Sequence, residues 1–467
     1  MKKDPVFVPI RVLSEWIQNR KMSPVEITEV FLDRLEVLGP KYNAVVTLTR
    51  DLALQQAREA EKEINSGNYK GPLHGIPYGV KDALATGGGI PTTWGATPLR
   101  DAKFDYDATV IRKLREAGAI LAAKLAMVEL AGGMGYRQPN ASFTGPGINP
   151  WDGNRWSGGS SSGAGSSVSA GLIPFAVGSE TWGSILIPAS HCGVSGLRPT
   201  YGIVSRHGAM VLSWSLDKIG PMGLTADDCG IVLEAIAGGD ELDPSTVTRA
   251  FKYHRKPTVK HFKLGVIKNI TERTNESVRS NFQTAVENLA AIADIEEVIL
   301  PDRPYEEMTR TILFAEMSSA FEDFIESGKI GELTAPEDRY TPYSRLVVFA
   351  KDYIRALRLR GIVAKEIDHV MAGLDALVAP TCPIPATKLD EDFRSMAGGL
   401  PGDVMGAIGN AAGLPSISVP NGFSKEGLPT GIQFMGKAYD DNVVIALACA
   451  YQSLTNWHLL HPPVPKP

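Results

Sequence analysis

Short apolar segments that alternate with amphipathic helical segments constrain the fold of this chain more than any other feature. Each apolar segment has the length and the aliphatic content of a buried β-strand. They cover residues 44–49, 119–124, 264–268, 296–300, 375–380 and 416–420. Such an alternation is typical of an α/β protein in which helices cover both faces of a sheet.

Some helices are recognisable from their ends. SPVE at residues 23–26 is a capping box with proline at the first helical position, and Gly-Pro at residues 39–40 ends the helix. A charged helix is predicted over residues 51–66, after the first strand. Asp107 is expected to cap the helix that follows it, and a further helix is predicted over about residues 277–293.

The composition narrows the class of protein. The 467 residues are 43% hydrophobic and 21% charged, with a formal net charge of −5. This charge offers no basic field, so neither nucleic acid nor a membrane is expected as a partner. Charged residues and a proline interrupt the N-terminal segment, which argues against a secretory signal, and no apolar run approaches the roughly 20 residues of a membrane span. We expect a soluble cytoplasmic protein, either a monomer or a homodimer.

The cysteines and the overall organisation add two expectations. The four cysteines are scattered without CxxC spacing, which predicts free thiols rather than a disulfide framework or a zinc site. No internal repeat and no long linker is present, so residues 1–467 are expected to form a single domain. Residues 238–343 are more charged than their flanks. They are predicted to be a variable, peripheral excursion, with a separate subdomain as the alternative.

Residues 157–190 are the most unusual stretch of the chain. They read SGGSSSGAGSSVSAGLIPFAVGSETWGSILIPAS, in which turns rich in glycine and serine alternate with apolar segments. A flexible linker is the simplest alternative, but a linker need not alternate with segments apolar enough for a core. The stretch lacks the lysine of a P-loop and the preceding strand of a dinucleotide site. GSSSG matches a nucleophile elbow centred on Ser161, but again no strand precedes it.

Several motifs together resemble the amidase signature family. LHGIPYGVKD occupies residues 73–82, GSETWGSILIPA residues 178–189 and GLRPTYGIVS residues 196–205. SLDKIGPM from Ser215 matches a further family motif, which also accounts for a chance S-x-x-K match. The resemblance covers nearly the whole chain, with its core motifs within residues 73–220. It implies the amidase signature fold, an α/β fold with a large central mixed sheet, and a hydrolase of amide-type C–N bonds without a cofactor or metal.

The resemblance also implies the catalytic residues. The family's nucleophile falls on Ser184, its serine in a cis peptide on Ser160 and its lysine base on Lys81. A lysine can take a proton from serine only when burial lowers its pKa by several units, and Lys81 stands in a mostly apolar segment. Two alternatives stay open on the residues alone. Lys81 can instead pair with Asp82, and either of the next two serines can act in place of Ser160.

Further site residues follow from the same match. An oxyanion hole is implied for four consecutive backbone N–H groups, those of Thr181, Trp182, Gly183 and Ser184. A substrate pocket is placed by analogy at three side chains, those of Met134, Tyr136 and Trp182. The family does not use the positions of His191 and His207, so we expect core or surface histidines there rather than a Ser-His-Asp triad.

Departures from the family pattern concern the substrate range. Trp182 replaces a glycine beside the nucleophile, and Leu186 replaces the usual arginine, so Glu180 is expected to lack its cation partner. The chemistry is expected to survive, because backbone N–H groups rather than side chains form the oxyanion hole.

The function expected from the sequence is a free-standing amidohydrolase. It is predicted to cleave small or aryl amides through an acyl-enzyme, with carbamates and esters as further substrates. The alternative is the A subunit of a glutamine-dependent tRNA amidotransferase, which shares the core. That branch usually carries an RYDG-like segment, which residues 310–331 lack. A non-catalytic scaffold of the same fold is the second alternative.

Overall fold

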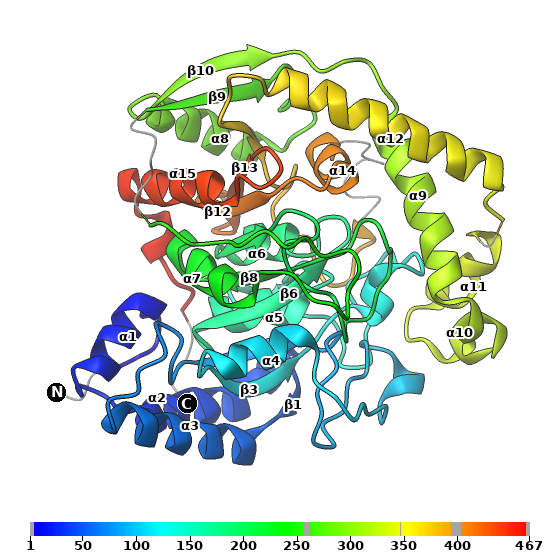
Figure 1. Cartoon of the computed structure of the whole chain (residues 1–467). Helices are drawn as coiled ribbons and strands as arrows, with labels where there is room; N and C mark the ends of the chain where they lie inside the picture. Colours follow the sequence, from blue (N-terminus) through cyan, green and yellow to red (C-terminus); the bar gives the residue numbers. More distant parts are fainter. Residues whose placement is uncertain (1–3, 256–260, 346, 394–402, 464–467) are drawn as a thin grey trace.

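One mixed sheet of 11 strands organises the computed structural model, which describes residues 4–255, 261–345, 347–393 and 403–463 (Figure 1). Its strands are β1 (Val45–Leu48), β2 (Pro77–Lys81), β3 (Ile120–Leu125), β6 (Phe175–Glu180), β7 (Ser195–Arg198), β8 (Lys218–Gly223), β9 (Phe262–Ile267), β10 (Ala293–Val298), β11 (Ala376–Pro380), β12 (Ser416–Phe423) and β13 (Pro429–Met435). They lie in the order β1-β3-β2-β6-β8-β7-β12-β13-β11-β9-β10. A separate two-stranded sheet pairs β4 (Ile148–Asn149) with β5 (Asp152–Trp156).

Strand directions make the sheet mixed. The neighbours β3, β2 and β6 run parallel, as do β11, β9 and β10. The remaining neighbours are antiparallel. Because β2 and β6 are parallel neighbours, their carboxyl ends, at Lys81 and Glu180, meet at the same edge of the sheet.

Helices surround this sheet. They are α1 (Ile10–Gln18), α2 (Pro24–Leu38), α3 (Arg50–Asn65), α4 (Thr109–Glu116), α5 (Ser162–Ser169), α6 (Leu186–Cys192), α7 (Ala226–Ile236), α8 (Glu276–Leu289), α9 (Tyr305–Ala320), α10 (Glu322–Glu326), α11 (Pro336–Arg345), α12 (Ala350–Val370), α14 (Val404–Ala411) and α15 (Asp441–Leu454).

Both faces of the sheet are covered. In β6, Phe175 and Val177 pack into one apolar cluster, and Ala176 between them packs into another. Alternate residues of a strand point to opposite faces, so the two clusters lie on opposite sides of the sheet. The first cluster receives side chains from α1, α7 and α15, and the second from α3, α5 and α6. The predicted α/β fold with a helix-covered mixed sheet is therefore confirmed.

The capping box at the start of α2 is also confirmed. Ser23 Oγ accepts a hydrogen bond from the N–H of Glu26 at 3.2 Å, and the Glu26 carboxylate accepts one from the N–H of Ser23 at 2.9 Å. Pro24 takes the first helical position, where its missing N–H costs no hydrogen bond.

Other predicted boundaries were wrong. Asp107 does not cap α4, because its carboxylate instead accepts from the Gly87 N–H at 2.8 Å and pairs with Arg115. The helix predicted to end near residue 293 ends at Leu289. The strand placed at residues 296–300 starts earlier, at Ala293, because that residue pairs in parallel with Phe262.

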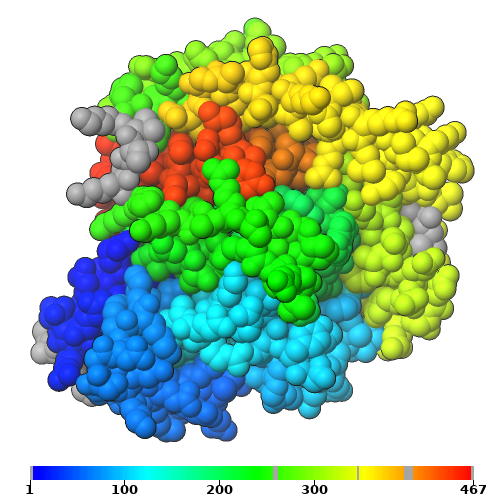
Figure 2. All heavy atoms as spheres, viewed as in Figure 1, coloured from blue at the N-terminus to red at the C-terminus, as the bar shows by residue number. Residues whose placement is uncertain are grey.

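The segment of residues 238–343 contributes both strands and helices. It supplies β9 and β10 at one edge of the sheet, together with α8, α9 and α10. On the face seen in Figure 2, α12 (yellow) forms the surface beside the C-terminal segments (orange and red). The four cysteines are free, and three of them are buried. In the described part of the chain, no helix has the length and apolarity that a membrane span needs.

Candidate active site

Lys81 ends β2 inside the protein. Its side chain is fully buried, and its amine contacts two serines from other segments. Nζ donates to Ser160 Oγ at 2.7 Å and to Ser179 Oγ at 3.0 Å, with the Ser179 carbonyl at 3.2 Å. The sheet thus places a primary amine within hydrogen-bonding distance of a serine 79 positions further along the chain.

Burial makes this amine a weak base. Removal of Lys81 from water disfavours its charged form, and this effect outweighs the attraction of the Asp217 and Glu180 carboxylates. The pKa of Lys81 falls from 10.5 to about 7. A large fraction of the amine is therefore neutral near neutral pH and able to accept a proton.

The alternative in which Lys81 pairs with Asp82 is wrong. The Asp82 carboxylate lies 3.1 Å from the Lys124 amine and accepts hydrogen bonds from Thr93. Lys124 in turn donates to the Leu84 carbonyl at 2.8 Å. Asp82 therefore pairs with Lys124. The Lys81 amine contacts Ser160 and Ser179 instead.

Three consecutive serines follow Gly159, and they have different contacts. The peptide bond between Gly159 and Ser160 is cis, as the family resemblance implies. The hydroxyl of Ser161 donates to the Ser179 carbonyl at 3.2 Å, and that of Ser162 to the Ala126 carbonyl at 3.4 Å. Ser160 is the member of this trio that contacts Lys81.

Ser184 lies in the loop between β6 and α6, close to the serine-rich turn. The Ser184 carbonyl accepts a hydrogen bond from the Ser161 N–H at 3.2 Å, which joins the two loops. Its side chain is 8% exposed, and its hydroxyl has no hydrogen-bond partner among the described residues. Gly183 before it has φ +82°, a left-handed conformation that glycine adopts without a steric penalty. Among the described contacts, the Ser184 hydroxyl is thus not hydrogen-bonded to Ser160, and its role as nucleophile stays a prediction.

The four backbone N–H groups predicted to form the oxyanion hole are also free. Within the described ranges, the N–H groups of residues 181–184 donate to no backbone or side-chain acceptor. They occupy one short loop that ends at the start of α6. Unpaired N–H groups that are already oriented can stabilise an oxyanion without reorganisation.

Buried carboxylates hold this loop at its two ends. The Thr181 hydroxyl donates to Asp217 at 2.5 Å. The Glu180 carboxylate accepts from the N–H groups of Ile185 and Leu186, at 2.9 and 3.1 Å, and thereby closes the loop on itself. Sequence reasoning missed both contacts.

Glu180 does have a cation partner, contrary to the expectation from the sequence. Leu186 cannot supply a charge, but the guanidinium of Arg198 from β7 lies 3.0 Å from the Glu180 carboxylate. Both side chains are fully buried. The expectation failed because it considered the neighbouring position in the sequence and not the strand packed against the loop.

The three predicted pocket residues lie in different apolar clusters. Met134 is fully buried with Met127 and Leu212, and Tyr136 packs against Trp156. Trp182 belongs to a third cluster, with side chains of α9, α12 and α14. The described contacts do not bring the three together, and their assignment to a pocket stays a prediction.

Neither histidine near the motifs contacts the candidate catalytic residues within the described chain. His191 is buried, which lowers its pKa to about 4, and its ring lies beside Trp156. The ring of His207 stacks on Tyr106 at 5.5 Å. Both have the packing roles expected from the sequence.

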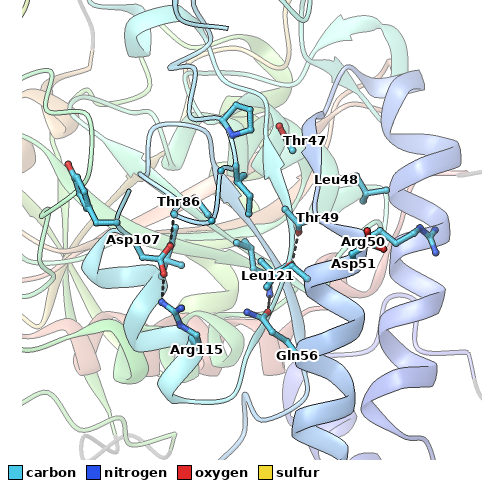
Figure 3. A pocket seen from close by; sticks show the side chains of 18 of the residues that line it. Thr47, Leu48, Thr49, Arg50, Asp51, Gln56, Thr86, Asp107, Arg115 and Leu121 are labelled. Atoms are coloured by element: carbon cyan, nitrogen blue, oxygen red, sulfur yellow. Dashed lines mark hydrogen bonds and ion pairs between the residues drawn. The ribbon is translucent and has the colours of Figure 1, made fainter. Parts of the chain in front are cut away.

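A cavity of about 610 Å³ lies elsewhere, between β1, α3, α4 and the glycine turn at residues 87–89 (Figure 3). Tyr78 lines it, three residues before Lys81 on β2. None of the predicted site residues lines it.

Comparisons with known proteins show the family to which the chain belongs. The amidase family model matches residues 26–445. The chain is 35% identical over 485 residues to the A subunit of the glutamyl-tRNA(Gln) amidotransferase of Synechococcus sp. (strain JA-2-3B'a(2-13)), a match that covers 98% of this chain and 94% of the relative.

Solved structures show the same similarity. The peptide amidase from Stenotrophomonas maltophilia is 30% identical, with a TM-score of 0.85 and 98% of each chain covered. The A subunit of glutamyl-tRNA(Gln) amidotransferase from Thermotoga maritima is 30% identical, with a TM-score of 0.81 and 100% of each chain covered. The chain therefore belongs to the amidase family, whose members hydrolyse amide C–N bonds.

Proposed function

We propose that the protein is a free-standing serine amidase with Ser184 as nucleophile, Ser160 as proton relay and Lys81 as base. The observation that carries the proposal is the 2.7 Å hydrogen bond between a fully buried amine and the Ser160 hydroxyl. An amine with a pKa of about 7 in contact with a hydroxyl has the properties of a general base at neutral pH.

The proposed reaction has two halves. Neutral Lys81 takes the proton of Ser160, and Ser160 takes that of Ser184 as the Ser184 oxygen attacks the amide carbon. The backbone N–H groups of residues 181–184 stabilise the resulting oxyanion. The proton then returns through Ser160 to the leaving nitrogen, the C–N bond breaks, and an ester on Ser184 remains. Water hydrolyses this ester by the same proton route.

The loop contacts support the proposed geometry. The Ser161 N–H donates to the Ser184 carbonyl, so the relay serine and the nucleophile stand on adjoining loops. Lys81 is the last residue of β2, and the loop that carries Ser184 follows the parallel neighbour β6. The proposed substrates are small or aryl amides, with carbamates and esters as further substrates, since an acyl-enzyme accepts any sufficiently good leaving group.

A second candidate function is the A subunit of a tRNA amidotransferase. The identity to curated proteins of that name, 34–35% over 97–98% of the chain, favours it. The missing RYDG-like segment favours the free-standing amidase. The two candidates differ in substrate and in their need for a partner protein.

The test is a hydrolysis screen of the purified chain with anilides, carbamates, aliphatic amides and glutamine. We expect turnover of at least one non-glutamine class without a partner, and its loss in Ser184→Ala. If glutamine is the only substrate that releases ammonia, and if this release needs an added partner protein, the chain would be assigned to the amidotransferase. Full activity of Ser184→Ala would reject the proposed nucleophile.

A further inference from the structure

Trp182 is anchored through its side chain, whereas its part in the proposed oxyanion hole uses only its backbone N–H. It lies two residues before Ser184, and its indole Nε1 donates to Asp403 Oδ2 at 2.8 Å. The guanidinium of Arg310, from α9, lies 5.9 Å from the centre of its ring. A residue of the nucleophile loop is thus fixed to a carboxylate 221 positions away along the chain.

Asp403 is itself held in place. It precedes α14, and its Oδ1 accepts from the Gly406 N–H at 2.7 Å, which caps the helix. A Cβ atom at position 406 would collide with this carboxylate, so the glycine permits the close approach. The two oxygens have separate partners: Oδ1 binds the helix and Oδ2 binds Trp182.

Helix α14, which Asp403 caps, is packed inside the protein. Met405 and each following residue of α14 are buried, and the Thr309 hydroxyl of α9 donates to the Ala407 carbonyl at 3.2 Å. Near the other end of α14, the Asn410 amide lies 3.5 Å from the Glu180 carboxylate. Since Glu180 binds the far end of the nucleophile loop, α14 contacts this loop through both Asp403 and Asn410.

Fixing Trp182 matters because of the residue that follows it. Gly183 is the most freely rotating residue of the loop, and a rotation there would redirect neighbouring N–H groups. An oxyanion hole stabilises the transition state only when its donors are oriented beforehand. A glycine at position 182, as in the family pattern, has no side chain that an acceptor can hold.

We propose that Asp403 is a positioning residue for the oxyanion hole, which acts through the indole N–H of Trp182. The inference rests on the proposed serine mechanism and adds to it a side chain outside the motifs. Its effect is on the transition state, because the hydrogen bond orients donors that the ground-state substrate does not yet need.

The test measures phosphonylation of Ser184 by a fluorophosphonate probe, separated into a maximal rate and a half-saturating probe concentration. Trp182→Phe keeps the ring and removes the N–H. Asp403→Ser keeps a helix cap, since serine is as good an N-cap as aspartate, but is too short to reach the indole. We expect each variant to lower the maximal rate by about tenfold to about a hundredfold, with the half-saturating concentration within about twofold.

A double variant and a matched control complete the design. Trp182→Phe with Asp403→Ser should be no slower than the slower single variant, because both changes remove one hydrogen bond. Trp151→Phe is the control: it removes an indole hydrogen bond of 2.9 Å, to the Cys192 carbonyl, and should label at the wild-type rate. Melting temperatures near the wild-type value would exclude a general loss of structure.

Four results would overturn the inference. An unchanged maximal rate in Trp182→Phe would leave Asp403 as a helix cap only. A raised half-saturating concentration with an unchanged rate would place the pair in probe binding instead. Absence of labelling in the wild type would reject the serine mechanism together with this inference. If Ser184→Ala abolishes labelling and both loop variants label at the wild-type rate, only the inference is rejected. If Asp403→Ser does not fold, Trp182→Phe decides.

Discussion

At Lys81, the burial that makes the amine a base also costs stability. The amine has a pKa of about 7 in the folded protein and of about 10.5 in the unfolded chain. Between these values the unfolded state holds a proton that the folded state lacks, so stability from this group rises with pH. Below about pH 7 both states are protonated, and the full cost of a buried ammonium is present.

Lys81→Met is therefore expected to be inactive yet more stable than the wild type at about pH 6. Methionine fills a similar volume without a charge, and replacing a buried charge in this way is often stabilising. The advantage should shrink as the pH rises, by up to about 1.4 kcal/mol per pH unit between about pH 7 and about pH 10.5. Urea unfolding at several pH values measures this, and an advantage that grows with pH would contradict the assigned pKa.

The hydroxyls of Ser160 and Ser161 have different partners, and we therefore expect different roles for them. Ser160 contacts the Lys81 amine, whereas Ser161 contacts the Ser179 carbonyl. Ser160→Ala removes the hydroxyl bound to Lys81 and should lower kcat by about a hundredfold to about ten thousandfold. Ser161→Ala removes a hydroxyl bound to the Ser179 carbonyl and serves as the matched control, with a smaller loss. Steady-state kinetics on the best substrate from the screen measure both losses of kcat. A larger loss of kcat in Ser161→Ala than in Ser160→Ala would assign the relay role to Ser161 instead.

The limits of sequence reasoning are clear at these residues. The apolar surroundings of Lys81 predict burial, but the partner of Asp82 is Lys124 on β3, and the partner of Glu180 is Arg198 on β7. Such pairs depend on which strands and loops pack together. Spacing along the chain does not give this information.

At the scale of elements, the pair of Glu180 and Arg198 joins the nucleophile loop to the sheet. The Glu180 carboxylate binds the N–H groups of Ile185 and Leu186 and the Arg198 guanidinium at once. One side chain thus fixes the start of α6 relative to β6 and β7, and with it the position of Ser184.

Glu180→Gln should lower the free energy of unfolding by about 3–5 kcal/mol and also reduce activity. It leaves the buried Arg198 charge uncompensated, which is the costly way to break a buried ion pair. Adding Arg198→Met should restore part of the stability but not the activity, because the loop contacts to Ile185 and Leu186 stay weakened. Urea unfolding with parallel kinetics checks this, and a Glu180→Gln variant as stable as the wild type would contradict it.

Helix ends show which local signals suffice. Ser23 and Glu26 satisfy each other within one turn, so their capping box needs no distant partner and was predictable. Asp107 has the right residue type for a cap, but Gly87 and Arg115 take its carboxylate. A cap is predictable where no tertiary partner competes for the side chain.

At the scale of the whole molecule, strand order assembles the site. The parallel neighbours β2 and β6 bring Lys81 and the loop after Glu180 to the same edge of the sheet, although about 100 residues separate them along the chain. The alternation of strands and helices predicts a sheet but not this order. The motif resemblance, and not periodicity, was therefore the source of the proposed site residues.

In the proposed mechanism neutral Lys81 activates Ser184 through Ser160, and the pH dependence of Ser184 phosphonylation tests this step. A fluorophosphonate does not titrate, so the rate reports the base. The rate should rise about tenfold per pH unit below about pH 7 and level off above it, because only the neutral amine accepts a proton. A rate that is flat below about pH 7, or that still rises towards about pH 10 as for an exposed lysine, would contradict the claim.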